Sequence, residues 1–182
     1  TFAAYPLAWR AELVLQTGDV AGAAELFSHA HALALEIADP CWESLASRGL
    51  GLVAAARGEH DKAARLLHDS RTACRRVNDA YVWLEAYGLA AQTAHAIALG
   101  RPAENLLEDL DQLASSHGMA ELQAEAAILR VQSGRLEALE TARSRVAAVD
   151  NPALAARLRR LEEIADDTAD SSVRSPASTS TG

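Results

Sequence analysis

Apolar residues recur along most of this chain at alternating steps of three and four, the spacing that places them on one face of an α-helix. One such stripe consists of Val20, Ala23, Phe27, Ala30, Ala34 and Ile37. Comparable stripes lie on both sides of Gly58, over residues 42–56 and 63–77. No stretch alternates convincingly with the period of two that marks a half-buried strand. The pattern therefore predicts an all-α protein.

Short helix-breaking motifs divide these stripes into nine predicted helices. Gly18-Asp19, Asp39-Pro40 and Asn151-Pro152 each combine an N-capping side chain with a helix-ending glycine or a helix-starting proline. Further breaks fall at Gly58, Asn78-Asp79, Gly100, Gly118 and Gly134. From residue 167 the chain becomes rich in Ser and Thr and lacks aromatic residues. Such a segment buries too little apolar surface to offset its ordering entropy, so 167–182 is predicted to be a flexible tail or linker.

The predicted turns recur with a regular period. Glycines at 18, 58, 100 and 134 are separated by 40, 42 and 34 residues, with two predicted helices in each interval. Two helices cannot bury both of their apolar stripes alone, and periods of this length are typical of α-solenoids. We therefore expect residues 1–166 to form an antiparallel α-solenoid of about four helical hairpins.

The first two repeats agree in detail around their turns. Ala23, Phe27 and Ala30 follow Gly18 at the same offsets at which Ala63, Leu67 and Ser70 follow Gly58. Small residues at the outer two positions let helices approach, and the bulky residue fills the remaining gap. Together with Leu50-Gly51 and the Gly-Asp or Gly-Glu turns, these residues resemble the tetratricopeptide repeat (TPR). The resemblance covers about residues 1–80, because after Gly100 the same offsets hold Asn105, Asp109 and Gln112.

The long period and the Asp-Pro joint are similar to the repeat regions of large bacterial regulators of the LuxR and MalT type. In that family the repeats form an arm beside an ATPase and a DNA-binding module. Neither a GxxxxGK[ST] motif nor a basic recognition helix occurs here. The chain begins without Met, and we expect it to be a piece of a longer protein.

The resemblance implies a non-catalytic interaction arm in which the first helix of each pair lines a concave face. Positions expected on that face include Glu12, Arg48, Leu52 and Tyr87. The expected partner is a protein, a peptide or another domain of the parent chain, with no cofactor. The alternative is a small-molecule sensor that binds its ligand between the hairpins. If the first hairpin lacks a capping repeat, apolar surface is exposed there and a homodimer becomes possible.

Composition limits the classes of partner. The net charge of −8 argues against binding to duplex DNA, which requires a basic face. No run of 18 apolar residues is present, and the first ten residues lack the charged and apolar regions of a signal peptide. We therefore expect a cytoplasmic protein that does not contact membranes.

Several residue clusters invite a chemical interpretation. His29 and His31 lie on different helix faces, and His60 and His68 are too far apart in sequence for a helical zinc site, so no metal is expected. No nucleophile elbow, phosphate loop or HExxH motif suggests an enzyme. A group of arginines could hold an anion, but a solvated face near a helix C-terminus is the simpler interpretation of Arg65, Arg71, Arg75 and Arg76. The charged run 157–163 is likewise expected to be solvated.

The location of the tryptophans and the pairing of the cysteines each have two possible interpretations. The tryptophans lie near the starts of first-of-pair helices, where they could line a shared groove or cap one edge of the core: Trp9, Trp42 and Trp83. Cys41 and Cys74 are expected at the same end of one hairpin, which makes pairing conceivable. In an acidic chain without a signal peptide, two reduced thiols that pack as small apolar residues are the simpler expectation.

Overall fold

The computed structural model describes the backbone of residues 3–78 and 81–173, and their side chains as far as residue 166. Helices account for all of the regular secondary structure in these ranges, and no strand occurs there. The α-helices are α1 (Ala4–Gln16), α2 (Val20–Glu36), α3 (Pro40–Ala56), α4 (His60–Ala73), α5 (Val82–Ala98), α6 (Glu104–Ser116), α7 (Ala120–Gln132), α8 (Leu139–Ala147) and α9 (Pro152–Val173). Two short 3₁₀ turns, η1 (Cys74–Arg76) and η2 (Leu136–Ala138), complete the order. The all-α prediction is confirmed.

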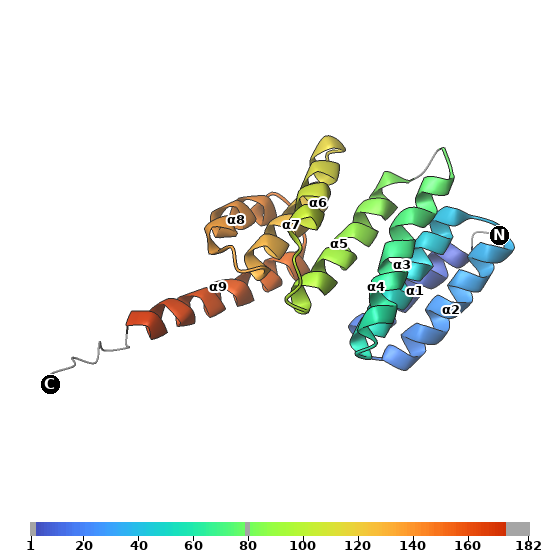
Figure 1. Ribbon diagram of the computed structural model, residues 1–182, viewed down its shortest axis with the longest axis horizontal. Coiled ribbons are helices and arrows are strands. Elements are labelled where there is room, and N and C mark those ends of the chain that lie inside the picture. Colours follow the sequence, from blue (N-terminus) through green and yellow to red (C-terminus); the bar gives the residue numbers. More distant parts are fainter. Residues whose placement is uncertain (1–2, 79–80, 174–182) are drawn as a thin grey trace, which may run out of the picture.

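The helices follow one another along the long axis of the molecule, and α1 and α9 lie toward opposite ends of it (Figure 1). Every α-helix packs against the next one in sequence. The odd-numbered helices also contact one another in series, α1 with α3, α3 with α5, α5 with α7, and α7 with α9. The odd-numbered helices therefore share a side of the molecule along its whole length.

The predicted turns are built by residues in the left-handed region. Gly18, Gly58, Gly100 and Gly134 have φ of 87°, 75°, 62° and 94°. A side chain is disfavoured at such angles, which is why glycine ends these helices. Ala38, between α2 and α3, has a φ of 52° and is the one non-glycine residue with positive φ in the described part of the chain.

The predicted caps also form. The side chain of Asp19 accepts a hydrogen bond from the backbone N–H of Gly22 at 2.8 Å, and Asp39 accepts from Cys41 at 2.9 Å. Asn151 accepts from Ala153 at 3.1 Å at the start of α9. These bonds satisfy N–H groups that a helix leaves unpaired in its first turn. At the joint before α5, Asp79 lies outside the described residues.

The core is built as three consecutive apolar clusters. The first joins α1, α2 and α3 with Cys74 of η1 and Leu84 of α5, the second lies among α5, α6 and α7, and the third among α7, α8 and α9. Alanine supplies much of each cluster, so helices approach closely. The fully buried Phe27 and Leu67 fill the gaps left beside Gly49 and Gly51. The small and bulky residues that resemble the repeat family therefore form helix contacts.

Two boundaries differ from the sequence prediction. The chain after the predicted break at Gly134 first forms η2, and α8 begins only at Leu139, so the apolar Leu136 is 49% exposed. The last helix passes the predicted break at residue 167 and continues to Val173. A helix that has already begun can continue through Ser and Thr, which have only modest helix propensity. The prediction from composition alone therefore placed the end of α9 too early. The rest of the predicted tail, 174–182, lies outside the described residues.

Both cysteines are buried in the first cluster and neither forms a disulfide. The pKa of the Cys74 thiol is raised to about 12, chiefly by burial, with Ser44 opposing the shift and the neighbouring Cys41 adding to it. The two thiols therefore lie close together, as the predicted hairpin requires. In this structure they are the packed, free thiols of the simpler interpretation.

Candidate binding groove

A groove with a cavity of about 420 Å³ lies along the odd-numbered helices. We call it the odd-helix groove. Helices α1, α3, α5, α7 and α9 all contribute to its lining, which includes Trp9, Glu12, Gln16, Arg48, Leu52, Tyr87, Ala94, Glu121, Glu125 and Arg157. Glu12, Arg48, Leu52 and Tyr87, the positions expected on the concave face, all belong to this set.

Helical spacing explains why these side chains converge. On α1 Glu12 and Gln16 are one turn apart, and on α3 Arg48 and Leu52 have the same separation. Residues separated by four lie above one another on a helix surface. The side chains of α1 and α3 that line the groove therefore form short rows along one side of each helix.

Arg48 connects three helices at one side of the groove. Its Nη1 donates to Oε2 of Glu12 at 2.7 Å, and its Nη2 lies 3.4 Å from Oε1 of the same carboxylate. Its Nε donates to the backbone carbonyl of Tyr87 at 3.3 Å, and the guanidinium lies 5.0 Å from the centre of the Tyr87 ring. The two charged side chains are only 13% and 16% exposed, so this pair is partly desolvated. Two-point pairing of this kind fixes the geometry as well as the charge.

Aromatic residues form a continuous patch beside Arg48. It contains every tryptophan and tyrosine of the chain, at Tyr5, Trp9, Trp42, Tyr81, Trp83 and Tyr87. Trp9 stacks on Trp83 with ring centres 6.4 Å apart and meets the edge of Tyr87 at 6.1 Å. Trp9 and Tyr87 line the groove, whereas Trp42 is buried in the core. Both interpretations of the tryptophans therefore hold, each for a different residue.

One polar atom in this patch lacks a partner. The indole Nε1 of Trp9 is buried and has no hydrogen-bond acceptor within the described part of the protein. A buried donor without an acceptor is costly, because it has given up its bonds to water. The unpaired indole N–H is therefore an unfavourable element of the packing around Trp9.

A second ion pair closes the far side of the groove. Nη1 of Arg157 donates to both carboxylate oxygens of Glu125, at 2.6 and 2.8 Å, and its Nη2 donates to Gln132 at 3.3 Å. Arg157 and Glu125 are 29% and 18% exposed. The prediction of a solvated face for 157–163 is thus wrong for Arg157, because α7 lies against this part of α9.

The charges of the groove do not balance. Three carboxylates, Glu12, Glu121 and Glu125, face two guanidinium groups, Arg48 and Arg157. Glu121 is exposed and has no basic partner among the described residues. The pKa of the Tyr87 hydroxyl is raised, chiefly by burial and further by these three carboxylates, against an opposing effect of Arg48. The groove is therefore slightly acidic.

A second, more apolar cavity of about 610 Å³ adjoins the odd-helix groove. The two cavities share Ala94 and Arg157. Its walls come from α5, α7 and α9 and include Ile97, Ala98, Val131 and Leu161. We call it the apolar extension. The side chain of Arg157 thus lies at the junction of a polar and an apolar section of one surface.

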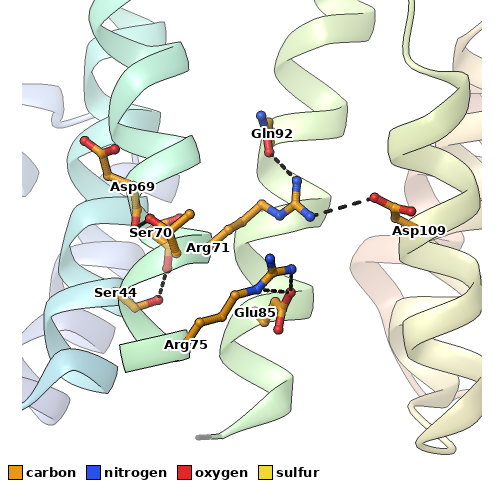
Figure 2. A network of polar contacts seen from close by, with 9 residues as sticks. Ser44, Asp69, Ser70, Arg71, Arg75, Glu85, Gln92 and Asp109 are labelled. Atoms are coloured by element: carbon orange, nitrogen blue, oxygen red, sulfur yellow. Dashed lines mark hydrogen bonds and ion pairs between the residues drawn. The ribbon is translucent and has the colours of Figure 1, made fainter. Parts of the chain in front are cut away.

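The arginine cluster of α4 and η1 lies elsewhere; Arg65 is exposed, and the other three arginines contact the protein's own side chains. Figure 2 shows Arg71 reaching from α4 toward α5 and α6, where its Nη1 donates to Gln92 at 3.0 Å and its Nη2 lies 3.9 Å from Asp109. Arg75 pairs with Glu85 (Figure 2), and Arg76 pairs with Glu43.

Arg71 corrects the sequence interpretation. Its side chain is 14% exposed and its Nε is buried without a partner, so it does not lie on a solvated face. Burial lowers the pKa of its guanidinium, and Arg75 lowers it further, while Glu85 and Asp109 oppose the change. Arg71 therefore joins three helices, and nearby carboxylates offset the charge of the cluster.

Sequence reasoning missed the residues contributed by α7 and α9. Glu121 and Glu125 are one turn apart on the predicted seventh helix, and this spacing was the available signal. The resemblance to the first two repeats is lost after Gly100, so no repeat motif pointed to Glu121 and Glu125. Arg157 lies in a run of charges in which nothing distinguishes it from its neighbours.

Comparisons with known proteins returned no match from protein-family models, from curated proteins or from solved structures. Within the described ranges, no three His, Cys, Asp or Glu side chains are grouped so as to hold a metal ion. In the same ranges no helix combines the length and apolar character needed to cross a membrane.

Proposed function

We propose that this chain is a TPR-like α-solenoid whose odd-helix groove binds a protein or peptide segment. The supporting observation is that one groove draws side chains from five helices spread from α1 to α9. In a solenoid the first helices of successive pairs line such a face, and a groove that crosses several repeats suits an extended ligand. The apolar extension lengthens the same surface.

The composition of the groove supports a binding role and not a catalytic one. Its lining contains no His, Cys, Ser or Lys, and its titratable acids are Glu12, Glu121, Glu125 and Tyr87. Glu12 and Glu125 are each held by an arginine. In line with the family resemblance, the proposal places this arm in a cytoplasmic bacterial transcription regulator. Its partner there is a peptide or another domain of the parent chain.

A small-molecule sensor is the second candidate. The cavity of about 420 Å³ falls in the range of about 300–1,000 Å³ that small-molecule sites occupy. Polar groups from several helices converge on it, as they do in such sites. A ligand of this kind would bind within the odd-helix groove and leave the apolar extension unused.

Peptide selection followed by affinity measurement tests the proposal. Peptides selected on the whole chain from a displayed random library would be labelled, and their affinity measured by fluorescence anisotropy. Leu52→Trp fills the groove, whereas Leu13→Trp makes the same change at a residue that is 63% exposed and does not line it. We expect Leu52→Trp to weaken binding at least about tenfold, and Leu13→Trp to bind like the wild type. Equal binding by both variants, or no selected peptide, would rule out the peptide function.

A further inference from the structure

The charge balance of the odd-helix groove specifies what kind of side chain it can accept. Glu12 and Glu125 already have arginine partners, so a ligand that used them would have to break an ion pair. Glu121 is exposed at the groove and has no such partner among the described residues. A positively charged group can therefore approach Glu121 without displacing anything. A carboxylate would add a fourth negative charge to a site that already holds three.

The protein's own Arg48 shows how the groove accommodates a cation. Its guanidinium lies 5.0 Å from the centre of the Tyr87 ring and is paired with the carboxylate of Glu12. A cation above an aromatic face next to a carboxylate is a favourable arrangement, worth more when the site is partly desolvated. Trp9 adds a second aromatic wall, and Glu121 adds a second carboxylate.

One further feature distinguishes a peptide from a free amine. The apolar extension begins at Ala94 and Arg157, where the polar section ends, and it offers space for an apolar side chain of the same ligand. A simple organic cation carries no such side chain.

From these features we infer that the odd-helix groove recognises a peptide segment carrying a lysine or arginine side chain next to Glu121 and an apolar side chain in the apolar extension. The inference rests on the proposed peptide-binding function and adds the chemistry of the ligand. The overall charge of −8 supports it, because an acidic protein attracts a basic segment during the encounter.

A matched set of peptide pools tests the inference. The probes are capped, fluorescein-labelled random nonapeptide pools with a fixed central arginine, a fixed central citrulline or a fixed central glutamate. Citrulline keeps the shape of arginine and removes its charge. We expect the arginine pool to bind the whole chain about tenfold more tightly than the citrulline pool, and the glutamate pool to bind most weakly.

Variants of the protein locate the effect. Glu121→Gln is expected to reduce the preference for arginine over citrulline about threefold, because an exposed carboxylate gives a modest pairing energy. Glu108→Gln removes the same charge from an exposed residue of α6 that does not line the groove, so it should leave the preference unchanged. A preference that falls equally in both variants would mean general charge attraction and would overturn the inference.

The outcomes separate the inference from the function on which it rests. If arginine and citrulline pools bind equally, and Leu52→Trp abolishes both, the groove binds peptides but does not read a basic side chain. If no pool binds, while arginine amide alone binds and is lost in Leu52→Trp, the groove is a small-molecule site and both proposals fail. If no probe binds, both proposals fail as well.

Discussion

Gly49→Ala probes a close contact between two helices. Gly49 of α3 faces Phe27 of α2, and a Cβ added there would lie 2.0, 2.2 and 2.3 Å from three atoms of the phenyl ring. Non-bonded carbon atoms normally stay about 3.5–4.0 Å apart. The ring or the helix would therefore have to move by roughly 1.5 Å to accept the new methyl group.

The surroundings of Phe27 decide the magnitude. The ring is 1% exposed, so it cannot swing into solvent, and the overlap must be relieved by separating α2 from α3. Overpacking of a core typically costs about 1–3 kcal/mol, while replacing a helical glycine by alanine returns about 0.5–1 kcal/mol. We expect a net loss of about 1–2 kcal/mol, which corresponds to a fall in Tm of roughly 2–8 °C for a chain of this size.

Thermal unfolding followed by far-UV circular dichroism measures the effect. Gly51→Ala provides a graded comparison, because the new Cβ would lie 2.8 Å from flexible side-chain atoms of Leu67, a smaller overlap. Phe27→Leu removes part of the ring, so Gly49→Ala should cost less in that background, with a coupling of about 1 kcal/mol. If Gly49→Ala melts at or above the wild-type temperature, α2 and α3 are not in the close contact described here.

Three further predictions concern stability. The pKa of Cys74 is about 12 in the folded protein against an ordinary value near 9, so the unfolded chain ionises first as the pH rises. The free energy of unfolding should be unaffected by this thiol below pH 9 and then fall by about 1.4 kcal/mol per pH unit. Urea titrations at several pH values should find a smaller slope in Cys74→Ala. Ala38→Gly should stabilise by about 0.5–1 kcal/mol, because Ala38 is exposed and has a φ of 52°; a lower Tm would contradict this. Gly51→Leu should destabilise the protein by about 1–3 kcal/mol, because the new side chain would overlap the buried Leu67. An unchanged melting temperature would contradict close packing between Gly51 and Leu67.

Much of the helical layout could be predicted because its causes are local. A left-handed glycine ends a helix wherever it occurs, and the side chains of Asp19, Asp39 and Asn151 bond to backbone groups two or three residues away. The turns and the caps therefore appear at the predicted residues. The end of α9 was misplaced because a helix that has already begun propagates through residues of modest propensity.

The groove could be predicted only in part. Glu12, Arg48, Leu52 and Tyr87 were expected on the face of the first-of-pair helices because the family resemblance covers or adjoins them, and the structure places all four in one lining. The prediction that Arg71 lies on a solvated face was wrong. An arginine on a helix surface is solvated or buried depending on whether other helices lie over it. In this structure α5 and α6 lie there.

The sequence by itself determined the α-helices of the described residues, their turns and their apolar stripes, because these depend on spacing and on bonds between near neighbours. Only the tertiary structure decided which charges meet. Arg48 and Glu12 are 36 residues apart, and Arg157 and Glu125 are 32 apart. Such pairs depend on how far α1, α3, α5, α7 and α9 are rotated and shifted against one another. That packing leaves Glu121 as the exposed acid of the groove, and no local pattern in the chain encodes it.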